Sequence, residues 1–307
     1  MTACTMESTE AALLGLSSAA NSGDSTDRSL RVLAEFVERI TEKGVDGIVK
    51  EYRRLDNFYD TAATYEAFRA NMPKNRYSDV VCTDSTRVKL KLGEEGYGDY
   101  IHANHVTSPL LTTKFICTQG PLQSTIHDFW RMIFQERIES ILMLCKPCED
   151  GRPKCSIYWP ESIGETTSFD TVVVKNTGED VDEFATTTSI MVELNPAYGM
   201  GLGCLIEALN ASKAFKVSIK QPTPLADPVL GAKKVRLPDS FIKYFIFLFK
   251  IARELRCARA QCIQTEVQYL YIHRVMIENA LLHINLNEST RTTGQRFLKE
   301  YDDKMRK

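Results

Sequence analysis

The sequence of 307 residues lacks an excess of either charge and lacks any hydrophobic run long enough to cross a membrane. Lysine and arginine together number 38 against 40 for aspartate and glutamate, so charge gives no reason to expect a nucleic acid or an anionic membrane as partner. The most apolar stretch, FIKYFIFLFKIA, carries Lys243 and Lys250 and falls well short of the roughly 20 residues that span a bilayer. The N-terminus has no basic segment followed by an apolar run of signal-peptide length. We therefore expect a cytoplasmic chain without a membrane span.

Patterns typical of disulfide frameworks and metal sites are also missing. The nine cysteines are an odd number at irregular spacing, which predicts reduced thiols. The CKPC stretch from Cys145 to Cys148 has the spacing of a zinc knuckle, but no second Cys/His pair stands at a matching distance. The five histidines include His102 and His105 in YIHANH but no HExxH pattern. We expect no metal and no other cofactor.

The two ends of the chain predict little fixed structure. Residues 1–28 are rich in Ser, Thr and Ala and have no aromatic residue, which is typical of a disordered tail. Residues 291–307 are polar and charged, and we expect them to fray. The chain as a whole is 43% hydrophobic and 25% charged, as in globular proteins, and we place its core in one domain over residues 29–290.

Periodicity within this domain predicts an α/β fold in which helices flank a mixed twisted sheet. Apolar residues at helical spacing follow Ser29, and Gly44 stands where a glycine ends a helix. Short strand-like runs follow: SDVVCTD, DYIHANHV, KFICTQG and the continuous ESILMLC, which predicts a fully buried strand. From about Pro238 the pattern is helical again. The interval 193–237 fits worst, because it is turn-rich and weakly periodic.

Five sequence blocks occur in order along the chain: KNRYSDVVCTDSTRVKL, DYIHAN, FICTQGPLQSTIHDFW, KCSIYWP and RAQCIQTEVQYLYIH. In these blocks the sequence resembles the classical protein-tyrosine phosphatases, including their nematode-type members. The resemblance covers roughly residues 30–190 and 250–290, and it implies the phosphatase fold and a phosphotyrosine-containing protein or peptide as partner. TQGPL matches a structural turn into a helix, and we expect Trp130 and Trp159 in the core.

The resemblance also implies roles for four residues at a substrate site. Tyr77 matches the ring that stacks on phosphotyrosine, a contact worth about 0.5–1.5 kcal/mol beyond area burial. Asp79 matches the carboxylate that pairs with backbone N–H groups of the bound peptide. Gln264 matches the glutamine that positions water for hydrolysis of a phosphocysteine, and Gln268 is its companion one helical turn later. By spacing alone, the alternatives are an edge strand with a surface aromatic and two surface glutamines.

Two further residues match a supporting lobe of the family. Glu149 and Lys154, in CEDGRPKC, match the lobe whose glutamate braces the catalytic arginine and whose lysine meets the loop of the general acid. Without the family context, this stretch is the charged tip of a hairpin.

The residues that carry the family's chemistry are missing. That chemistry needs a cysteine nucleophile with a lowered pKa and, six residues later, an arginine that grips the phosphoryl oxygens. None of the nine cysteines is followed six residues later by arginine. The general acid would be an aspartate after a Trp–Pro pair, and only LPDSF offers a degenerate candidate, Asp239. Asp239 fits equally well the turn beyond that loop, or the N-cap of the next helix.

The glycine-rich stretch NPAYGMGLG admits two alignments with the family. In the first it stands in place of the catalytic loop, with Asn195 for the loop histidine, Pro196 for the nucleophile and Leu202 for the arginine. In the second it is a turn in a replacement segment, and the catalytic loop has been lost before ARELRCARAQCIQT. Under both alignments the nucleophile and the arginine are absent, and Pro196 removes one N–H donor that a phosphate cradle would use.

These observations predict a catalytically inactive phosphatase-like domain, a pseudophosphatase, that binds phosphotyrosine proteins or serves as an interaction module. One alternative is an active protein-tyrosine phosphatase, working through a phosphocysteine, whose catalytic segment this chain lacks through splicing or an imperfect gene model. Another is a domain that folds poorly because core strands of the family are absent.

Overall fold

The computed structural model divides the chain into two compact units, where we predicted one domain. The smaller unit holds Met1–Ile48, Val235–Leu248 and Ile272–Lys307, and the larger holds Val49–Lys234 and Phe249–Tyr271. The structure describes residues 22–56, 58, 60–93, 96–107, 114–182, 185–195, 214–222, 248–283 and 286–306. Most of the divergent interval 193–237 therefore lies outside the described residues.

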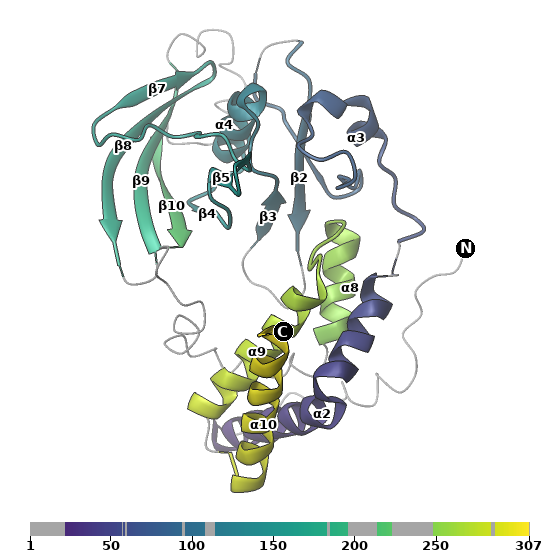
Figure 1. The fold of residues 1–307 in the computed structure, drawn as a ribbon. Coiled ribbons are helices and arrows are strands. Elements are labelled where there is room, and N and C mark those ends of the chain that lie inside the picture. Colours follow the sequence, from purple (N-terminus) through teal and green to yellow (C-terminus); the bar gives the residue numbers. More distant parts are fainter. Residues whose placement is uncertain are drawn as a thin grey trace. The chain divides into compact units, whose positions relative to one another are not determined.

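Helix α2 (Ser22–Asp56) opens the described chain (Figure 1). It begins inside the segment 1–28 that we predicted to be disordered. At Gly44 the backbone has φ 62° and ψ 176°, in the left-handed region that glycine adopts without strain. The helix is therefore kinked at Gly44, the residue that we predicted to end a helix.

Helix α10 (Glu288–Met305) lies in the C-terminal segment that we expected to fray. Asn287 caps its N-terminus, because the side-chain oxygen accepts a hydrogen bond from the N–H of Thr290 at 2.8 Å. Phe297 and Tyr301 are buried on one face of the helix. The helical periodicity of α10 is difficult to detect in the sequence, because its buried face carries few large apolar side chains and the rest of the helix is polar.

The larger unit contains a small antiparallel sheet and a larger mixed sheet, which confirms the predicted α/β fold. The antiparallel sheet has the order β1 (Arg87–Lys89), β2 (Tyr100–Val106) and β3 (Phe115–Thr118). The mixed sheet has the order β4 (Ser140–Leu142), β10 (Ala214–Pro222), β9 (Ala185–Leu194), β8 (Val172–Val181) and β7 (Thr166–Phe169). Strands β4 and β10 are parallel, and the other pairs of this sheet are antiparallel.

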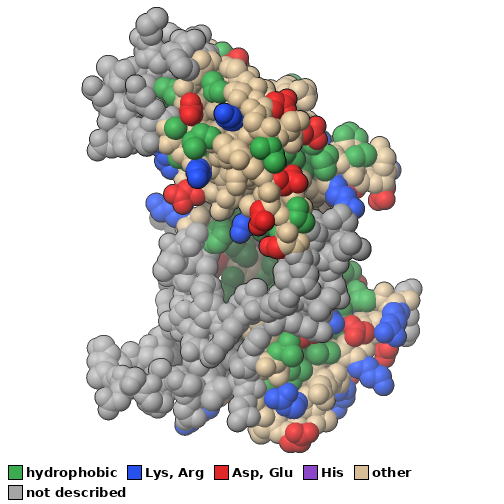
Figure 2. Space-filling view, turned by 90° about the vertical axis from the view of Figure 1, so that its left-hand side faces the viewer, with side chains coloured by type: hydrophobic (Ala, Val, Ile, Leu, Met, Phe, Trp, Pro, Cys, Tyr) green, Lys and Arg blue, Asp and Glu red, His purple; other side chains and the backbone are tan. Residues whose placement is uncertain are grey.

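Shorter elements complete the larger unit. They are α3 (Glu66–Ala70), η1 (Met72–Lys74), η2 (Gln123–Thr125), α4 (Ile126–Gln135), α8 (Leu248–Ala258), the first part of α9 (Glu266–His283), and a hairpin of β5 (Cys148–Glu149) and β6 (Arg152–Pro153). None of the helices in the described ranges is both long enough and apolar enough to cross a membrane. Over the β7–β10 sheet, in the upper part of Figure 2, acidic and basic side chains are interspersed rather than gathered by sign.

Helix α4 supplies the centre of the core of the larger unit. It packs against β7 and β8, and Trp130 is fully buried. The indole N–H of Trp130 donates to the carbonyl of Tyr158 at 2.5 Å, and the rings of Phe129 and Tyr158 lie 4.7 Å apart. Trp159 packs against the same cluster while partly buried. Both tryptophans are therefore core residues, as predicted, because a buried indole needs both apolar contacts and an acceptor.

Three strand assignments from sequence need correction. Residues 78–84 form no strand. ESILMLC is not fully buried, because Leu142 is 65% and Leu144 79% exposed. Among the described residues, β4 pairs with a strand on one side only, which leaves it at an edge. Part of the interval 193–237, which we read as turn-rich and weakly periodic, forms strand β10. In this strand Val217 and Ile219 alternate with polar neighbours and are buried.

A buried charge cluster joins α4 to the segments around it. Asp128 is fully buried and accepts hydrogen bonds from Lys74 Nζ at 2.9 Å and from Arg131 Nη1 at 2.7 Å. Arg131 Nε also donates to the carbonyl of Leu92 at 2.5 Å. Burial raises the pKa of Asp128, but hydrogen bonds from His127 and Lys74 outweigh it and hold the pKa below its usual value.

We expect Asp128→Asn to lower the free energy of unfolding by about 3–5 kcal/mol, because the substitution leaves Arg131 buried without its counter-ion. Since the pKa of Asp128 is lower in the folded chain than in the unfolded one, its stabilisation is present above the unfolded pKa. It is lost as the pH falls through the lower, folded pKa. Urea unfolding of the full chain, followed by circular dichroism at neutral and acidic pH, measures both effects.

Asp99→Asn is the matched control, because the carboxylate of Asp99 also pairs with an arginine, Arg87 Nη2 at 2.7 Å, but is 54% exposed. We expect a loss below about 1 kcal/mol for this exposed pair. Equal losses in the two variants would contradict a special role for the buried cluster.

Candidate functional site

The segment that carries Tyr77 is held in place by the side chain of Arg76, the preceding residue. The guanidinium of Arg76 donates to three backbone carbonyls: those of Gly120 at 2.9 Å, Pro121 at 2.7 Å and Pro153 at 3.2 Å. Pro121 belongs to the TQGPL turn, and Pro153 belongs to the β5–β6 hairpin. A planar guanidinium presents its donors in a fixed fork, so Arg76 fixes three segments relative to one another.

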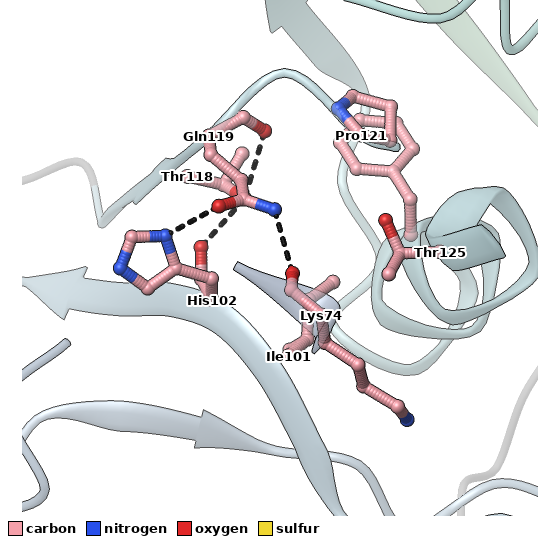
Figure 3. Close-up of a pocket in the computed structure, with 8 residues that line it drawn as sticks. Lys74, Ile101, His102, Thr118, Gln119, Pro121 and Thr125 are labelled. Carbon is pink, nitrogen blue, oxygen red and sulfur yellow. Dashed lines mark hydrogen bonds between the residues drawn. The ribbon is translucent and has the colours of Figure 1, made fainter. Parts of the chain in front are cut away.

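The amide of Gln119 makes a second junction, with His102 and the backbone of Lys74 (Figure 3). Its Oε1 accepts the backbone N–H of Arg76 at 2.9 Å, and its Nε2 donates to the carbonyl of Lys74 at 2.9 Å. These two backbone groups determine which way the amide points. His102 Nδ1 lies 2.7 Å from Gln119 Oε1 and must therefore donate to it.

His102 is a structural residue of this junction rather than a proton donor or acceptor for a substrate. Its ring is 1% exposed. Burial, followed by the charge of Arg259, lowers the pKa of His102 to about 4, so the ring is neutral at physiological pH. The role of histidine in YIHANH is thus to supply one N–H to Gln119.

A small pocket lies at the same junction (Figure 3). It encloses about 230 Å³, including space open to solvent, and is lined by Lys74, Ile101, His102, Thr118, Gln119, Pro121, Thr125 and Phe129. Its polar side chains bond to one another or to nearby backbone, as Thr118 Oγ1 does with the carbonyl of His102 at 3.1 Å. The pocket is thus part of the hydrogen-bonded junction around Gln119 and offers few free groups to a ligand.

The structure brings together Tyr77 and Lys154, two of the residues predicted for the site. The Tyr77 ring is 41% exposed, and Lys154 Nζ lies 6.0 Å from its centroid, at the limit of a cation–π contact. Gly120 lets the TQGPL turn pack closely against the backbone of Lys154, because a Cβ there would lie 2.7 Å from the carbonyl oxygen of Lys154. An open aromatic face beside a cation suits a ligand that combines an aromatic ring with negative charge.

The other predicted substrate-binding residues lie around a second loop. Asp79 is exposed, and its carbonyl accepts a hydrogen bond from Gln261 Nε2 at 3.1 Å. This bond holds the segment after Tyr77 against the loop that also carries Gln264, whose side chain is exposed. The loop is sharply turned, since Gln261 and Ile263 adopt φ of 61° and 58° without being glycine.

Gln268 has a local structural partner at the start of α9. Its Oε1 accepts the N–H of Gln264 at 2.7 Å and that of Thr265 at 3.2 Å, while its own N–H donates to Thr265 Oγ1 at 3.2 Å. This reciprocal pattern is a capping box, which the TEVQ stretch encodes. The side chain that matches the family's companion glutamine is therefore engaged in capping the helix.

The remaining candidates contribute no assembled catalytic group. Glu149 Oε1 accepts the backbone N–H of Lys146 at 3.0 Å. Asn195, the start of NPAYGMGLG, donates through Nδ2 to the carbonyl of Asp170 at 2.6 Å and so closes the β7–β8 turn. Asp239, Pro196 and Leu202 lie outside the described residues. Within the described ranges, no group of three or more His, Cys, Asp or Glu side chains is placed to hold a metal ion.

Sequence reasoning missed Arg76 and Gln119, the two residues that organise the site. Both stand in quoted blocks, KNRY and TQGPL, but nothing in their spacing shows that the blocks meet. Arg76 follows a short 3-10 helix, and Gln119 follows strand β3. Only the folded chain brings their hydrogen-bonding groups together.

Comparison with known proteins gives one family. The family model described as protein-tyrosine phosphatase matches residues 71–197. Tyrosine-protein phosphatase 69D of Drosophila melanogaster is 43% identical over 131 residues, which are 42% of this chain and 9% of that protein. Receptor-type tyrosine-protein phosphatase F of Bos taurus is 31% identical over 280 residues, 81% of this chain and 14% of that protein. Tyrosine-protein phosphatase non-receptor type 18 of Mus musculus is 29% identical over 235 residues, 68% of this chain and 52% of that protein.

The fold agrees with this assignment. The solved structure of PTPN18 in complex with HER2-pY1196 phosphopeptides matches with a TM-score of 0.64 at 23% identity, covering 80% of this chain and 98% of that chain. At this identity the match supports the fold alone. The chain spans between 9% and 52% of the lengths of the three phosphatases named above. The match over residues 71–197 and the shared names of these relatives lead to one conclusion: residues 71–197 match the protein-tyrosine phosphatase family, and the chain is similar to proteins of that name.

Proposed function

We propose that the chain binds phosphotyrosine peptides without hydrolysing them, as a pseudophosphatase. One observation carries the proposal: an exposed tyrosine ring, Tyr77, stands beside the cation of Lys154 in a chain with no cysteine followed six residues later by arginine. The first half of this observation supports recognition, and the second half supports the absence of turnover.

The recognition half rests on the chemistry of phosphotyrosine, which combines a ring with a dianion. The face of Tyr77 offers stacking for the ring, worth about 0.5–1.5 kcal/mol beyond area burial. Lys154 offers a charge-assisted donor for the phosphate. Arg76 supports both contacts, because its bonds to Gly120 and Pro153 hold the tyrosine segment and the lysine hairpin together. Asp79 and Gln264, exposed on neighbouring segments, are the proposed contacts for the peptide backbone.

We infer the absence of turnover from the missing pair of a cysteine and, six residues later, an arginine. Hydrolysis through a phosphocysteine needs a thiolate nucleophile and a cation that stabilises the charge of the transition state. Of the described cysteines, Cys82 and Cys155 are buried, and burial raises the pKa of each thiol. Cys117 and Cys262 lie on separate segments, strand β3 and the connection between α8 and α9. None of these thiols lies in an arrangement that offers a phosphate both a thiolate nucleophile and a stabilising cation.

One comparison supports the proposed partner, and the state of the described cysteines supports the proposed compartment. PTPN18, whose fold this chain shares, has been solved with phosphotyrosine peptides of HER2, and we extend that ligand class to this chain. The described cysteines are all free thiols, which favours a reducing compartment, and we propose the cytoplasm.

A second candidate function is an active phosphatase whose catalytic segment has been lost from this chain. The observation that favours it lies at β4, an edge strand among the described strands. Leu142 in β4 and Leu144 two residues beyond it present exposed apolar side chains that a further segment would cover. Sequencing the transcript across the codons for residues 185–260 separates the two. An additional in-frame segment there would support the active enzyme, and a transcript encoding this chain as it stands would exclude it.

For binding, we expect Tyr77→Ala to weaken the affinity for a phosphotyrosine peptide about fivefold, or by about 1 kcal/mol, because the stacking surface is lost. Tyr77→Phe should retain the affinity. Lys154→Ala should weaken binding in a way that added salt reduces, since salt screens the contact between charges. Isothermal titration of the full chain with phosphotyrosine, phosphoserine and unphosphorylated forms of one peptide measures these effects.

Lys175→Ala is the matched control for Lys154, because Lys175 is an exposed lysine on strand β8. It should leave the affinity unchanged. Equal affinity for the phosphorylated and unphosphorylated peptides, or undiminished binding by Tyr77→Ala, would contradict the proposed site.

For turnover, we expect the purified chain to hydrolyse para-nitrophenyl phosphate no faster than buffer. Removal of a nucleophile that works as a unit with its partners costs a factor on the order of a million. Release of nitrophenolate measured over hours tests this expectation. A rate above the buffer blank that is abolished by a Cys→Ser substitution at one position would overturn it.

A further inference from the structure

The connection between α8 and α9, here called the α8–α9 loop, has its backbone carbonyls held by side chains from outside it. The guanidinium of Arg256, on α8, donates through Nε to the carbonyl of Cys262 at 3.0 Å and through Nη2 to that of Ile263 at 2.7 Å. The hydroxyl of Tyr52, near the end of α2, donates to the carbonyl of Gln264. Three consecutive carbonyls of the loop are therefore fixed by two side chains.

Arg256 also ties the α8–α9 loop to helix α2. Its Nη1 donates to the carbonyl of Leu55 at 2.7 Å, and its side chain is only 8% exposed. Tyr52, one helical turn before Leu55, is buried, and burial raises the pKa of Tyr52, so that its hydroxyl stays protonated as a donor. The planar fork of a guanidinium reaches several carbonyls at once, which the single ammonium of a lysine does not match.

These contacts hold the loop in a backbone conformation that its residues rarely adopt. Gln261 and Ile263 have φ angles of 61° and 58°, in the left-handed region that a β-branched side chain such as that of isoleucine seldom enters. The N–H of Gln264 donates to Gln268 Oε1 at 2.7 Å, so the loop is also held through an amide. Backbone of this kind persists only where the surrounding contacts over-determine it, and it is concentrated at functional sites.

The exposed side chains of the α8–α9 loop lie at the proposed peptide site. Gln261 Nε2 donates to the carbonyl of Asp79 at 3.1 Å, and the side chain of Gln264 is exposed. Asp79 and Gln264 are the proposed contacts for the peptide backbone, whereas Tyr77 and Lys154 are those for phosphotyrosine itself. The contacts that fix the loop therefore lead to the groups that would meet the peptide main chain.

We propose that Arg256 and Tyr52 are positioning residues for recognition of the peptide main chain. They fix the α8–α9 loop before a ligand arrives, and Gln261 passes that position to the segment of Asp79. Because the loop is already ordered, binding of a peptide does not have to supply the free energy of ordering it. This inference rests on the proposed function, since it concerns the same phosphotyrosine-peptide site.

The positioning is tested first without a ligand, by hydrogen–deuterium exchange of the full chain. In Arg256→Gln we expect the amides of Gln264 and Thr265 to exchange about tenfold faster, because the loop loses the bonds that hold its carbonyls. Arg256→Lys should behave in the same way, since it keeps the charge but not the fork. Tyr52→Phe should speed the exchange to a smaller extent.

Arg253→Gln is the matched control for these variants. Arg253 is also on α8, is exposed, and lies with its guanidinium carbon 4.6 Å from the ring centroid of Phe58 rather than on the loop. Its substitution removes the same charge from the same helix and should leave the exchange of the loop unchanged.

Binding then separates the main chain of a ligand from its phosphotyrosine side chain. The probes are a phosphotyrosine peptide, followed by isothermal titration, and phenyl phosphate, which has the ring and the dianion but no main chain, followed by ligand-observed NMR. We expect Arg256→Gln to weaken the affinity for the peptide about three- to tenfold and to leave that for phenyl phosphate unchanged. A general loss of folded protein would weaken both equally.

Gln261→Asn tests the last link, because asparagine tolerates the left-handed conformation but its side chain is one methylene shorter. We expect this variant to keep the slow exchange of the loop and to lose affinity for the peptide alone. Circular dichroism checks that each variant is folded. Tyr52→Phe and Gln261→Asn keep the proposal open to contradiction even if Arg256→Gln does not fold.

Unchanged exchange of the loop in the Arg256 and Tyr52 variants would overturn the proposal. So would an equal loss of affinity for the peptide and for phenyl phosphate, or a parent chain that binds both probes equally tightly. A parent chain that binds neither probe would instead contradict the proposed function. The exchange measurement would still decide whether Arg256 and Tyr52 fix the loop.

Discussion

The site depends on the hydrogen bonds between the guanidinium of Arg76 and three backbone carbonyls. Those carbonyls belong to the TQGPL turn and to the β5–β6 hairpin, which are separate in the sequence. The amide of Gln119 adds to this junction by accepting the N–H of Arg76 and donating to Lys74. Without these contacts, little would hold Tyr77 and Lys154 as neighbours, since both side chains are exposed at least in part.

In the larger unit, the residues that hold the fold together are present, whereas the groups that would carry out hydrolysis are not. Its scaffold is built around Trp130, the buried Asp128 cluster and the His102–Gln119 junction, in which nearly every polar group described above has a partner. A buried polar group without a partner costs more than a bond gains, which explains why most of the polar groups in these junctions are hydrogen-bonded. The reactive step of the family, in contrast, needs a free thiolate and a free guanidinium on one loop. The sequence contains no such pair at the required spacing.

Particular elements show where pattern reading succeeds. The helix around Trp130, strand DYIHANHV and the break at Gly44 follow from apolar spacing and from the conformational freedom of glycine, and each occurs as predicted. Strand β10 was missed although Phe215, Val217 and Ile219 alternate, because the surrounding turn residues obscured a short period-two signal. Helix α10 was expected to fray because its apolar face is narrow.

The sequence by itself determined the resemblance to the protein-tyrosine phosphatases, the α/β class, the core tryptophans and the absence of the cysteine–arginine pair. These properties depend on residue identity and local periodicity, which need no knowledge of what packs against what. Only the tertiary structure decided that β4 lies at an edge of the sheet among the described strands, that Gln268 caps a helix, and that Arg76 joins three segments. Each of these results depends on which distant segment arrives as a neighbour, and neighbours across long sequence separations are set by packing and hydrogen bonding of the whole unit.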